Sequence, residues 1–179
     1  RQRVGSQRRV TPRSIPAEKS IEGPTTMASS GSEKSRAYAT CVRLLSRREY
    51  GSRALRRKLQ DKGYSTSICD DVLAQLENSG LQSDERCAEA ILRTGAHRGW
   101  SQRRCRARML QEGLSEETIA SAPWHDETEE QIRARNLYHK WIGDDHHDPK
   151  KRRRVLQRLA RRGFAIHFLF DEMDEPPKR

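Results

Sequence analysis

Arginine is the side chain with the greatest capacity for chemistry in this sequence. The 179 residues include 36 Lys and Arg against 25 Asp and Glu, and 28 of the basic residues are arginine. A guanidinium binds phosphate or carboxylate through two parallel N–H donors, so this composition favours recognition of an acidic partner such as nucleic acid. The alternative is an arginine-rich coding bias with no binding role, and composition does not separate the two.

The basic residues gather in three segments and in the turns between helices. Each segment is expected to form the second helix of a repeated helical unit, so stacked units would align the segments as one basic stripe. We predict that this stripe contacts DNA or an acidic protein surface; a solvated charged face is the alternative. The candidate residues are Arg47, Arg48, Arg56, Arg57, Lys58, Arg98, Arg103, Arg104, Arg106, Arg108, Lys150, Lys151, Arg152, Arg153, Arg154, Arg158, Arg161 and Arg162.

Two aromatic residues lie beside these arginines. Tyr50 and Trp100 are 50 residues apart and each precedes a basic segment. An exposed ring in this position could stack on an unpaired base. The favoured alternative is a packing role that closes each unit, because the position recurs with the period of the apolar residues.

No cofactor, metal or catalytic site is expected. The run 144–148 reads Asp-Asp-His-His-Asp, but adjacent residues rarely converge on one ion. The sequence contains no phosphate-binding loop with Gly-Lys-Ser/Thr and no GxGxxG, HExxH or GxSxG motif, so we expect a binding protein rather than an enzyme. The four cysteines (Cys41, Cys69, Cys87 and Cys105) form no CxxC pair and are expected to be reduced thiols in the core of a cytoplasmic protein.

The elements that must position these groups are helices in a repeat. Gly63, Gly113 and Gly163 are spaced 50 residues apart, each is preceded four residues earlier by Leu or Met, and each is followed by an apolar residue. Glycine at this place ends a helix. No alternating strand pattern is visible. The sequence therefore predicts an all-α fold of three tandem three-helix repeats, about nine short helices, in an elongated and curved array whose stacked units extend one core.

The predicted repeats occupy residues 37–81, 82–123 and 124–172. Ser83, Ser115 and Asp126 are the predicted starts of helices, with Asp126 and Glu129 resembling a capping box. Residues 1–36 are polar and basic and are expected to be a disordered tail, and residues 173–179 a disordered C-terminus. No membrane-spanning stretch and no secretory leader is visible.

The apolar and basic pattern resembles the RecX family. The run Leu-Leu-Ser-Arg-Arg-Glu-Tyr-Gly-Ser at 44–52, followed by Leu55, Leu59 and Lys62-Gly63, is similar to the first repeat of that family. The second repeat is matched at Leu81, Asp84, Ala88, Gly99, Arg104 and Glu112-Gly113, with departures at Ser83 and Cys87. The third is weaker but includes Leu159 and Arg162-Gly163-Phe164.

The resemblance implies a regulator of the RecA recombinase. A protein of this family would bind the RecA filament and inhibit its assembly, ATPase or recombinase activity, and so modulate DNA repair, recombination and the SOS response. It would contact single-stranded DNA, and double-stranded DNA weakly, and we expect a monomer. The alternative is a helix-turn-helix-like regulator that binds DNA independently of RecA and selects a duplex sequence.

Overall fold

The computed structural model describes residues 26–169, with side chains from residue 31. Helices joined by turns and short connections make up this part of the chain, and it contains no strand. The helices are α1 (Thr26–Leu45), α2 (Ser52–Gln60), α3 (Thr66–Asn78), α4 (Asp84–Arg98), α5 (Gln102–Glu112), α6 (Glu116–Ala120), α7 (Glu127–Ile142) and α8 (Pro149–Arg161). Residues 167–169 are again helical where the described part ends. The predicted all-α repeat is confirmed.

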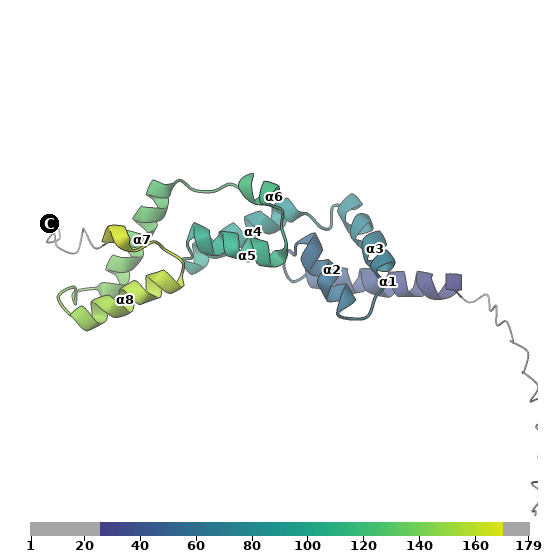
Figure 1. Ribbon diagram of the computed structural model, residues 1–179, viewed down its shortest axis with the longest axis horizontal. Coiled ribbons are helices and arrows are strands. Elements are labelled where there is room, and N and C mark those ends of the chain that lie inside the picture. Colours follow the sequence, from purple (N-terminus) through teal and green to yellow (C-terminus); the bar gives the residue numbers. More distant parts are fainter. Residues whose placement is uncertain (1–25, 170–179) are drawn as a thin grey trace, which may run out of the picture.

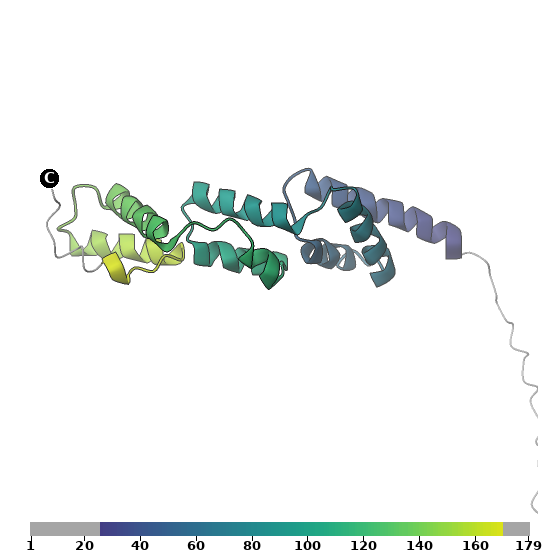
Figure 2. The ribbon, with the colours of Figure 1, turned by 90° about the horizontal axis from the view of Figure 1, so that it is seen from above.

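The helices form three units that follow one another in an elongated, slightly arched row (Figure 1). Unit one contains α1–α3, unit two α4–α6, and unit three α7, α8 and the helical residues 167–169. The view from above shows the same order (Figure 2). The predicted boundaries at 81/82 and 123/124 fall in the connections between α3 and α4 and between α6 and α7.

Each unit has its own hydrophobic core. Unit one is centred on Leu55, Leu59 and Leu76, unit two on Met109 with Ile119, and unit three on a separate cluster around α7 and α8. Neighbouring units were expected to extend one core, but the buried residues fall into three clusters. The reason is that the contacts between units are largely polar, as described below.

The repeat with a period of 50 is a repeated helix ending. Gly63, Gly113 and Gly163 have φ values of 87°, 86° and 94°. In each case the next N–H donates to a carbonyl five residues earlier, over 3.2, 3.1 and 3.2 Å. This is the Schellman ending, which requires the left-handed conformation that glycine adopts without strain. The accepting residues Leu59, Met109 and Leu159 are fully buried, so the same motif ends the helix and fills the core.

The predicted helix starts are confirmed. Ser83, Ser115 and Asp126 are the N-caps of α4, α6 and α7, and each side-chain oxygen accepts a backbone N–H from the first turn. The side chain of Glu129 does not complete a capping box, because its carboxylate contacts His125 Nδ1 at 2.8 Å.

The tail prediction is wrong for residues 26–36, which belong to α1. These residues are poor in apolar side chains, which led to the prediction of disorder. Once Ala37 and Cys41 are fully buried, however, the helix extends toward its N-terminus with one backbone hydrogen bond for each added residue. Lys34 Nζ also contacts Asp71 Oδ2 on α3 at 3.1 Å. Residues 1–25 and 170–179, with the rest of both predicted termini, lie outside the described residues.

The units are joined through the first turns of their helices. Asp84 Oδ1 on α4 accepts the backbone N–H of Ser52 at 2.8 Å, and Glu130 Oε2 on α7 accepts that of Gln102 at 2.8 Å. Each carboxylate thus satisfies an orphan donor at the start of the second helix of the preceding unit. The same device is used at both junctions, and it sets the register between units.

All four cysteines are free and buried, as predicted. Burial raises the pKa of Cys41 to about 11 and that of Cys87 to about 12. No helix in the described part of the chain is long and apolar enough to cross a membrane.

Candidate nucleic-acid and protein interface

Two adjoining grooves run along unit two and its junction with unit three. The central groove, about 760 Å³, extends along α4 and α5 and reaches Arg48 of unit one and Arg161 of unit three. The junction groove, about 860 Å³, lies between the C-terminal ends of α4, α7 and α8. Both grooves share Arg98, Trp100, Arg104 and Arg161, so they form one continuous surface.

A third hollow continues this surface onto unit one. The first-unit hollow, about 350 Å³, lies between α2 and the end of α5, and it shares Arg48, Arg108 and Gln111 with the central groove. Of the described residues, eleven cationic ones and three carboxylates (Glu49, Asp61 and Glu112) line the three hollows together. The cationic residues are Arg48, Arg57, Lys58, Arg98, Arg103, Arg104, Arg108, Lys140, Arg158, Arg161 and Arg162.

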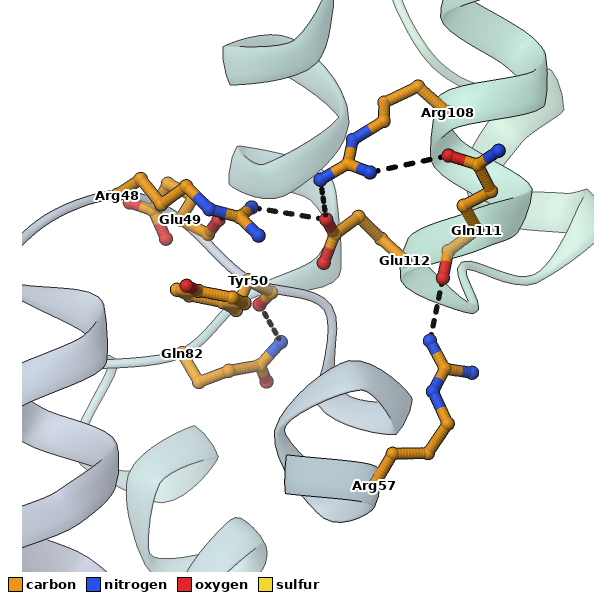
Figure 3. A network of polar contacts seen from close by, with 8 residues as sticks. All are labelled: Arg48, Glu49, Tyr50, Arg57, Gln82, Arg108, Gln111 and Glu112. Carbon is orange, nitrogen blue, oxygen red and sulfur yellow. Dashed lines mark hydrogen bonds and ion pairs between the residues drawn. The ribbon is translucent and has the colours of Figure 1, made fainter. Parts of the chain in front are cut away.

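The first junction carries its own counter-charge. Glu112 is only 3% exposed, and its Oε1 accepts from Arg48 at 3.1 Å and from Arg108 at 2.5 Å (Figure 3). The guanidinium of Arg57 on α2 reaches the backbone oxygen of Gln111 at 2.6 Å. One buried carboxylate therefore neutralises arginines from two units at the place where those units meet.

The neighbouring carboxylate extends this network. Glu49 contacts Arg86 on α4 at 3.3 Å, and Gln82 donates to the backbone oxygen of Tyr50 at 3.3 Å. One oxygen each of Glu49 and Glu112 is buried without a hydrogen-bond partner in the described part of the chain. The carboxylates therefore have more acceptor capacity than the junction uses.

The second junction has the opposite charge at the equivalent position. Arg162 lies 50 residues after Glu112, and its guanidinium donates to the backbone oxygens of Arg98 and, at 3.4 Å, of Gly99. Burial, and the nearby positive charges of Arg158 and Arg104, lower the pKa of Arg162 below its ordinary value. Among the residues that the structure describes, no carboxylate lines the junction groove.

The structure brings together ten of the predicted contact residues. Arg48, Arg57 and Lys58 lie at unit one, Arg98, Arg103, Arg104 and Arg108 at unit two, and Arg158, Arg161 and Arg162 at unit three. The basic surface thus follows α2, α5 and the C-terminal half of α8, which is close to the predicted stripe.

The other eight predicted residues lie away from these three hollows. Arg56 is paired with Asp70, Arg106 with Glu116 and Lys151 with Asp145. Residues 150–154, in the N-terminal half of α8, lie roughly 10–17 Å along the helix from Arg161, at about 1.5 Å for each residue. The residues outside the hollows are Arg47, Arg56, Arg106, Lys150, Lys151, Arg152, Arg153 and Arg154.

Tyr50 and Trp100 are half-buried against the cores of units one and two. The guanidinium of Arg48 lies 3.6 Å from the centre of the Tyr50 ring, and that of Arg104 lies 4.8 Å from the centre of Trp100. Each ring therefore packs on its own unit and also supports an arginine, a favourable cation–π arrangement.

Sequence reasoning missed Lys140 and Trp141, which both line the junction groove. Trp141 follows Cys41 and Ile91 at the spacing of 50 residues, which indicates a core position. In the structure it is half-buried, and Arg158 and Arg162 lie 4.0 and 4.9 Å from the centre of its ring. A larger residue where the other units have a small or aliphatic one was the available signal.

The run 144–148 has structural partners. Asp145 pairs with Lys151, whose hydrogen bond and charge lower the pKa of that carboxyl, and Asp148 caps α8 by accepting the N–H of Lys150 at 2.8 Å. Across the described residues, no group of three or more His, Cys, Asp or Glu side chains is placed to hold a metal ion.

Comparison with known proteins gives the family. The model of the RecX first three-helix domain matches residues 37–76, and that of the RecX second three-helix domain matches residues 83–122. The Regulatory protein RecX of Mannheimia succiniciproducens is 33% identical over 131 residues, which cover 72% of this chain and 86% of that protein. The Regulatory protein RecX of Stenotrophomonas maltophilia is 36% identical over 122 residues, covering 68% of this chain and 75% of its own.

Solved structures share the fold. The crystal structure of RecX from Lactobacillus salivarius superimposes with a TM-score of 0.65 at 17% identity, covering 80% of this chain and 95% of that one. A second crystal structure of regulatory protein RecX gives a TM-score of 0.65 at 20% identity, covering 82% and 76%. The similar proteins are named as regulators rather than enzymes. The matched domains, the relatives and the repeated fold together show that this chain belongs to the RecX family of regulatory proteins.

Proposed function

We propose that this protein binds the filament that the RecA recombinase forms on single-stranded DNA and inhibits its assembly and ATPase activity. The observation that carries the proposal is membership of the RecX family over about 131 residues. In this role it would modulate DNA repair, recombination and the SOS response. It would act in the cytoplasm, where its partner works, as a monomer and without catalysis of its own.

The shape and charge of the molecule support this proposal. A filament is a long, regular target, and a row of three units can contact more of it than a compact domain of the same length. Eleven cationic residues line the three connected hollows, against three carboxylates. Such a surface suits phosphates and acidic protein side chains, and its contacts would be distributed and salt-sensitive.

The test is ATP hydrolysis by RecA on single-stranded DNA, with the protein titrated from far below to equal stoichiometry. We expect inhibition well below one molecule for each RecA protomer, because one elongated molecule would block several filament positions. No effect at equal stoichiometry, with folded protein and active filaments, would refute the proposal. Selective binding to one duplex sequence in the absence of RecA would instead favour the helix-turn-helix-like regulator.

A further inference from the structure

The contacts between units two and three are confined to one turn of unit two. Among the described residues, every hydrogen bond that joins unit two to residues 125–169 involves residues 98–104, where α4 ends and α5 begins. From the C-terminal end of α8, the Arg162 oxygen accepts the N–H of Ser101 at 3.0 Å. From α7, the Arg133 guanidinium donates to the Trp100 oxygen at 3.0 Å. The second junction is therefore a narrow pivot.

The chain segment that connects the two units is short and lies at the same pivot. Trp124 belongs to unit two, because its ring packs on the core of that unit and its indole N–H donates to the Ile119 oxygen at 2.7 Å. Only His125 and Asp126 lie between Trp124 and the start of α7. The side chain of Gln102 donates to the His125 oxygen at 2.8 Å. A few residues at the end of a helix are enough to absorb the dihedral changes of a hinge.

The two junctions differ in how closely their helices pack. At the first junction α5 packs against α2, and the guanidinium of Arg57, more than a turn inside α2, donates to the Gln111 oxygen at 2.6 Å. At the second junction the equivalent helices, α8 and α5, meet end to end and pack less closely in the described part of the chain (Figure 1). The cores of units two and three are also separate clusters. Two domains are expected to move relative to each other unless a large apolar interface joins them.

The walls of the junction groove have charges of the same sign on both units. Arg98 and Arg104 line it from unit two, and Arg158 and Arg162 from unit three. Burial, together with the charges of Arg158 and Arg104, lowers the pKa of Arg162, which agrees with repulsion across the junction. No ion pair joins units two and three within the part of the chain that the structure describes. Like charges disfavour the docked arrangement of the two units, and salt weakens this repulsion.

The first junction has the opposite electrostatics. Two ion pairs cross it, Arg48 with Glu112 at 3.1 Å and Arg86 with Glu49 at 3.3 Å. Both guanidiniums are half-exposed, so salt screens these attractions. Added salt is therefore expected to loosen the first junction slightly and to tighten the second.

We propose that the second junction is the hinge of the array, that unit three swings on unit two about residues 98–104, and that like charges across the junction groove oppose its docked state. Units one and two move together as one body. Unit three docks more completely as salt screens the guanidiniums, and its motion lets this end of the array adjust to the shape of the surface that it meets. The inference concerns the protein on its own and does not depend on the proposed function.

Double electron–electron resonance between spin labels on the three units tests the proposal. Cysteines for the labels replace Gln75 on α3, Arg93 on α4 and Asn136 on α7, which are exposed. The pair Gln75→Cys with Arg93→Cys reports on the first junction, and Arg93→Cys with Asn136→Cys reports on the second. The four native cysteines are buried, so they react slowly with the label in the folded protein, and mass spectrometry confirms that two labels are attached.

The expected result is a wide distance distribution across the second junction that salt narrows. At about 0.01 M salt, where the Debye length is about 30 Å, we expect it to be at least about twice as wide as the distribution across the first junction. At about 1 M salt, where the Debye length is about 3 Å, the second distribution should narrow and the first should not.

Charge variants test whether the groove arginines cause the repulsion. Arg158→Gln with Arg161→Gln removes two charges that line the junction groove and should narrow the second distribution even at low salt. The matched control is Arg153→Gln with Arg154→Gln, which removes two exposed charges from the same helix outside the hollows and should narrow it less. Far-UV circular dichroism checks that each labelled variant is folded, so that unfolding is not mistaken for motion of unit three.

Three results would overturn the proposal. Equal widths across the two junctions at low salt would show that the second junction is no more mobile than the first. A second distribution that widens with salt would show that attraction, not repulsion, dominates there. Equal narrowing by the groove variant and its control would show that the charges lining the groove do not oppose docking.

Discussion

The three glycines of the repeat offer a matched set of substitutions that separates backbone strain from packing between units. Gly63, Gly113 and Gly163 end equivalent helices with nearly equal positive φ values. A Cβ at Gly63 would meet no atom within 4 Å, whereas one at Gly113 would lie 2.6 Å from Arg53 Cβ and one at Gly163 would overlap Ser101 Oγ. Alanine at Gly63 therefore tests the backbone alone, and alanine at the other two also tests a junction.

The expected cost can be worked out for Gly63 and Gly163. An alanine in the left-handed conformation costs about 1–2 kcal/mol, which is the whole effect expected at Gly63. Ser101 is fully buried, and its hydroxyl accepts the N–H of Arg104 at 3.1 Å as the cap of α5. Displacing it would cost about 1 kcal/mol for the cap and about 1–3 kcal/mol for overpacking. We therefore expect a loss of about 3–6 kcal/mol for Gly163→Ala.

Urea unfolding followed by tryptophan fluorescence measures this difference. Trp100, Trp124 and Trp141 all lie beyond residue 82, so their emission reports units two and three and the connection between them. We expect Gly163→Ala to move this transition far more than Gly63→Ala, and circular dichroism to detect the smaller effect at Gly63. Undocking of unit three would also raise the radius of gyration in X-ray scattering for Gly163→Ala alone. Equal costs at the two sites would refute the description of the second junction.

Three further predictions concern the interiors of the units and the first junction. Gly95→Ala should destabilise unit two by about 1–3 kcal/mol in urea unfolding, because the new Cβ would overlap Cys105 Sγ. Alanine favours helices more than glycine does, so a gain in stability would contradict this packing. Burial raises the pKa of Cys87 from 9.0 to about 12, so the thiol of the unfolded chain loses its proton at lower pH than that of the folded chain. The free energy of unfolding should therefore fall as the pH rises from about 9 toward 12. Cys87→Ala should remove this part of the pH dependence, and an unchanged pH dependence would argue against a buried thiol. Glu112→Gln removes the carboxylate charge that lies 3.1 Å from the guanidinium of Arg48. We expect the free energy of unfolding to fall by about 1–2 kcal/mol, a modest loss because the half-exposed guanidinium is partly hydrated. No measurable loss in a urea titration would show that this network does not hold the junction together.

The repeat could be predicted from the sequence because its helix starts and endings depend on residues that are close together in the chain. A helix ending needs a left-handed residue and an apolar anchor four residues earlier, and Gly63 with Leu59 satisfies both. Serine and aspartate at the caps are equally local signals, and Ser83 and Asp126 were identified for that reason. Features of this kind depend on a few neighbouring residues and not on how the units meet.

The assembly of the interface could be predicted only in part. Arginines on helices 50 residues apart indicated a basic stripe, but which of them face a groove depends on the angle between units. That angle is set by contacts such as those of the Asp84 carboxylate with the N–H of Ser52 and of the Glu130 carboxylate with the N–H of Gln102. In the sequence, each of these acids is indistinguishable from an ordinary acid in the first turn of its own helix. Glu112 and Arg162 occupy equivalent positions at the two junctions and have opposite charges. The structural effect of this difference could not be predicted from the sequence, because it depends on which residues each junction brings close.

Binding to RecA filaments is the most direct test of the function proposed for this protein. RecA filaments assembled on single-stranded DNA with a slowly hydrolysed ATP analogue can be sedimented with the protein present. The control samples contain RecA without DNA, or bead-bound naked single-stranded DNA without RecA. We expect the protein to enter the pellet with the filaments at an affinity well above that for either component alone. Equal recovery with naked single-stranded DNA, or recovery with neither, would contradict the proposal that the filament is its target.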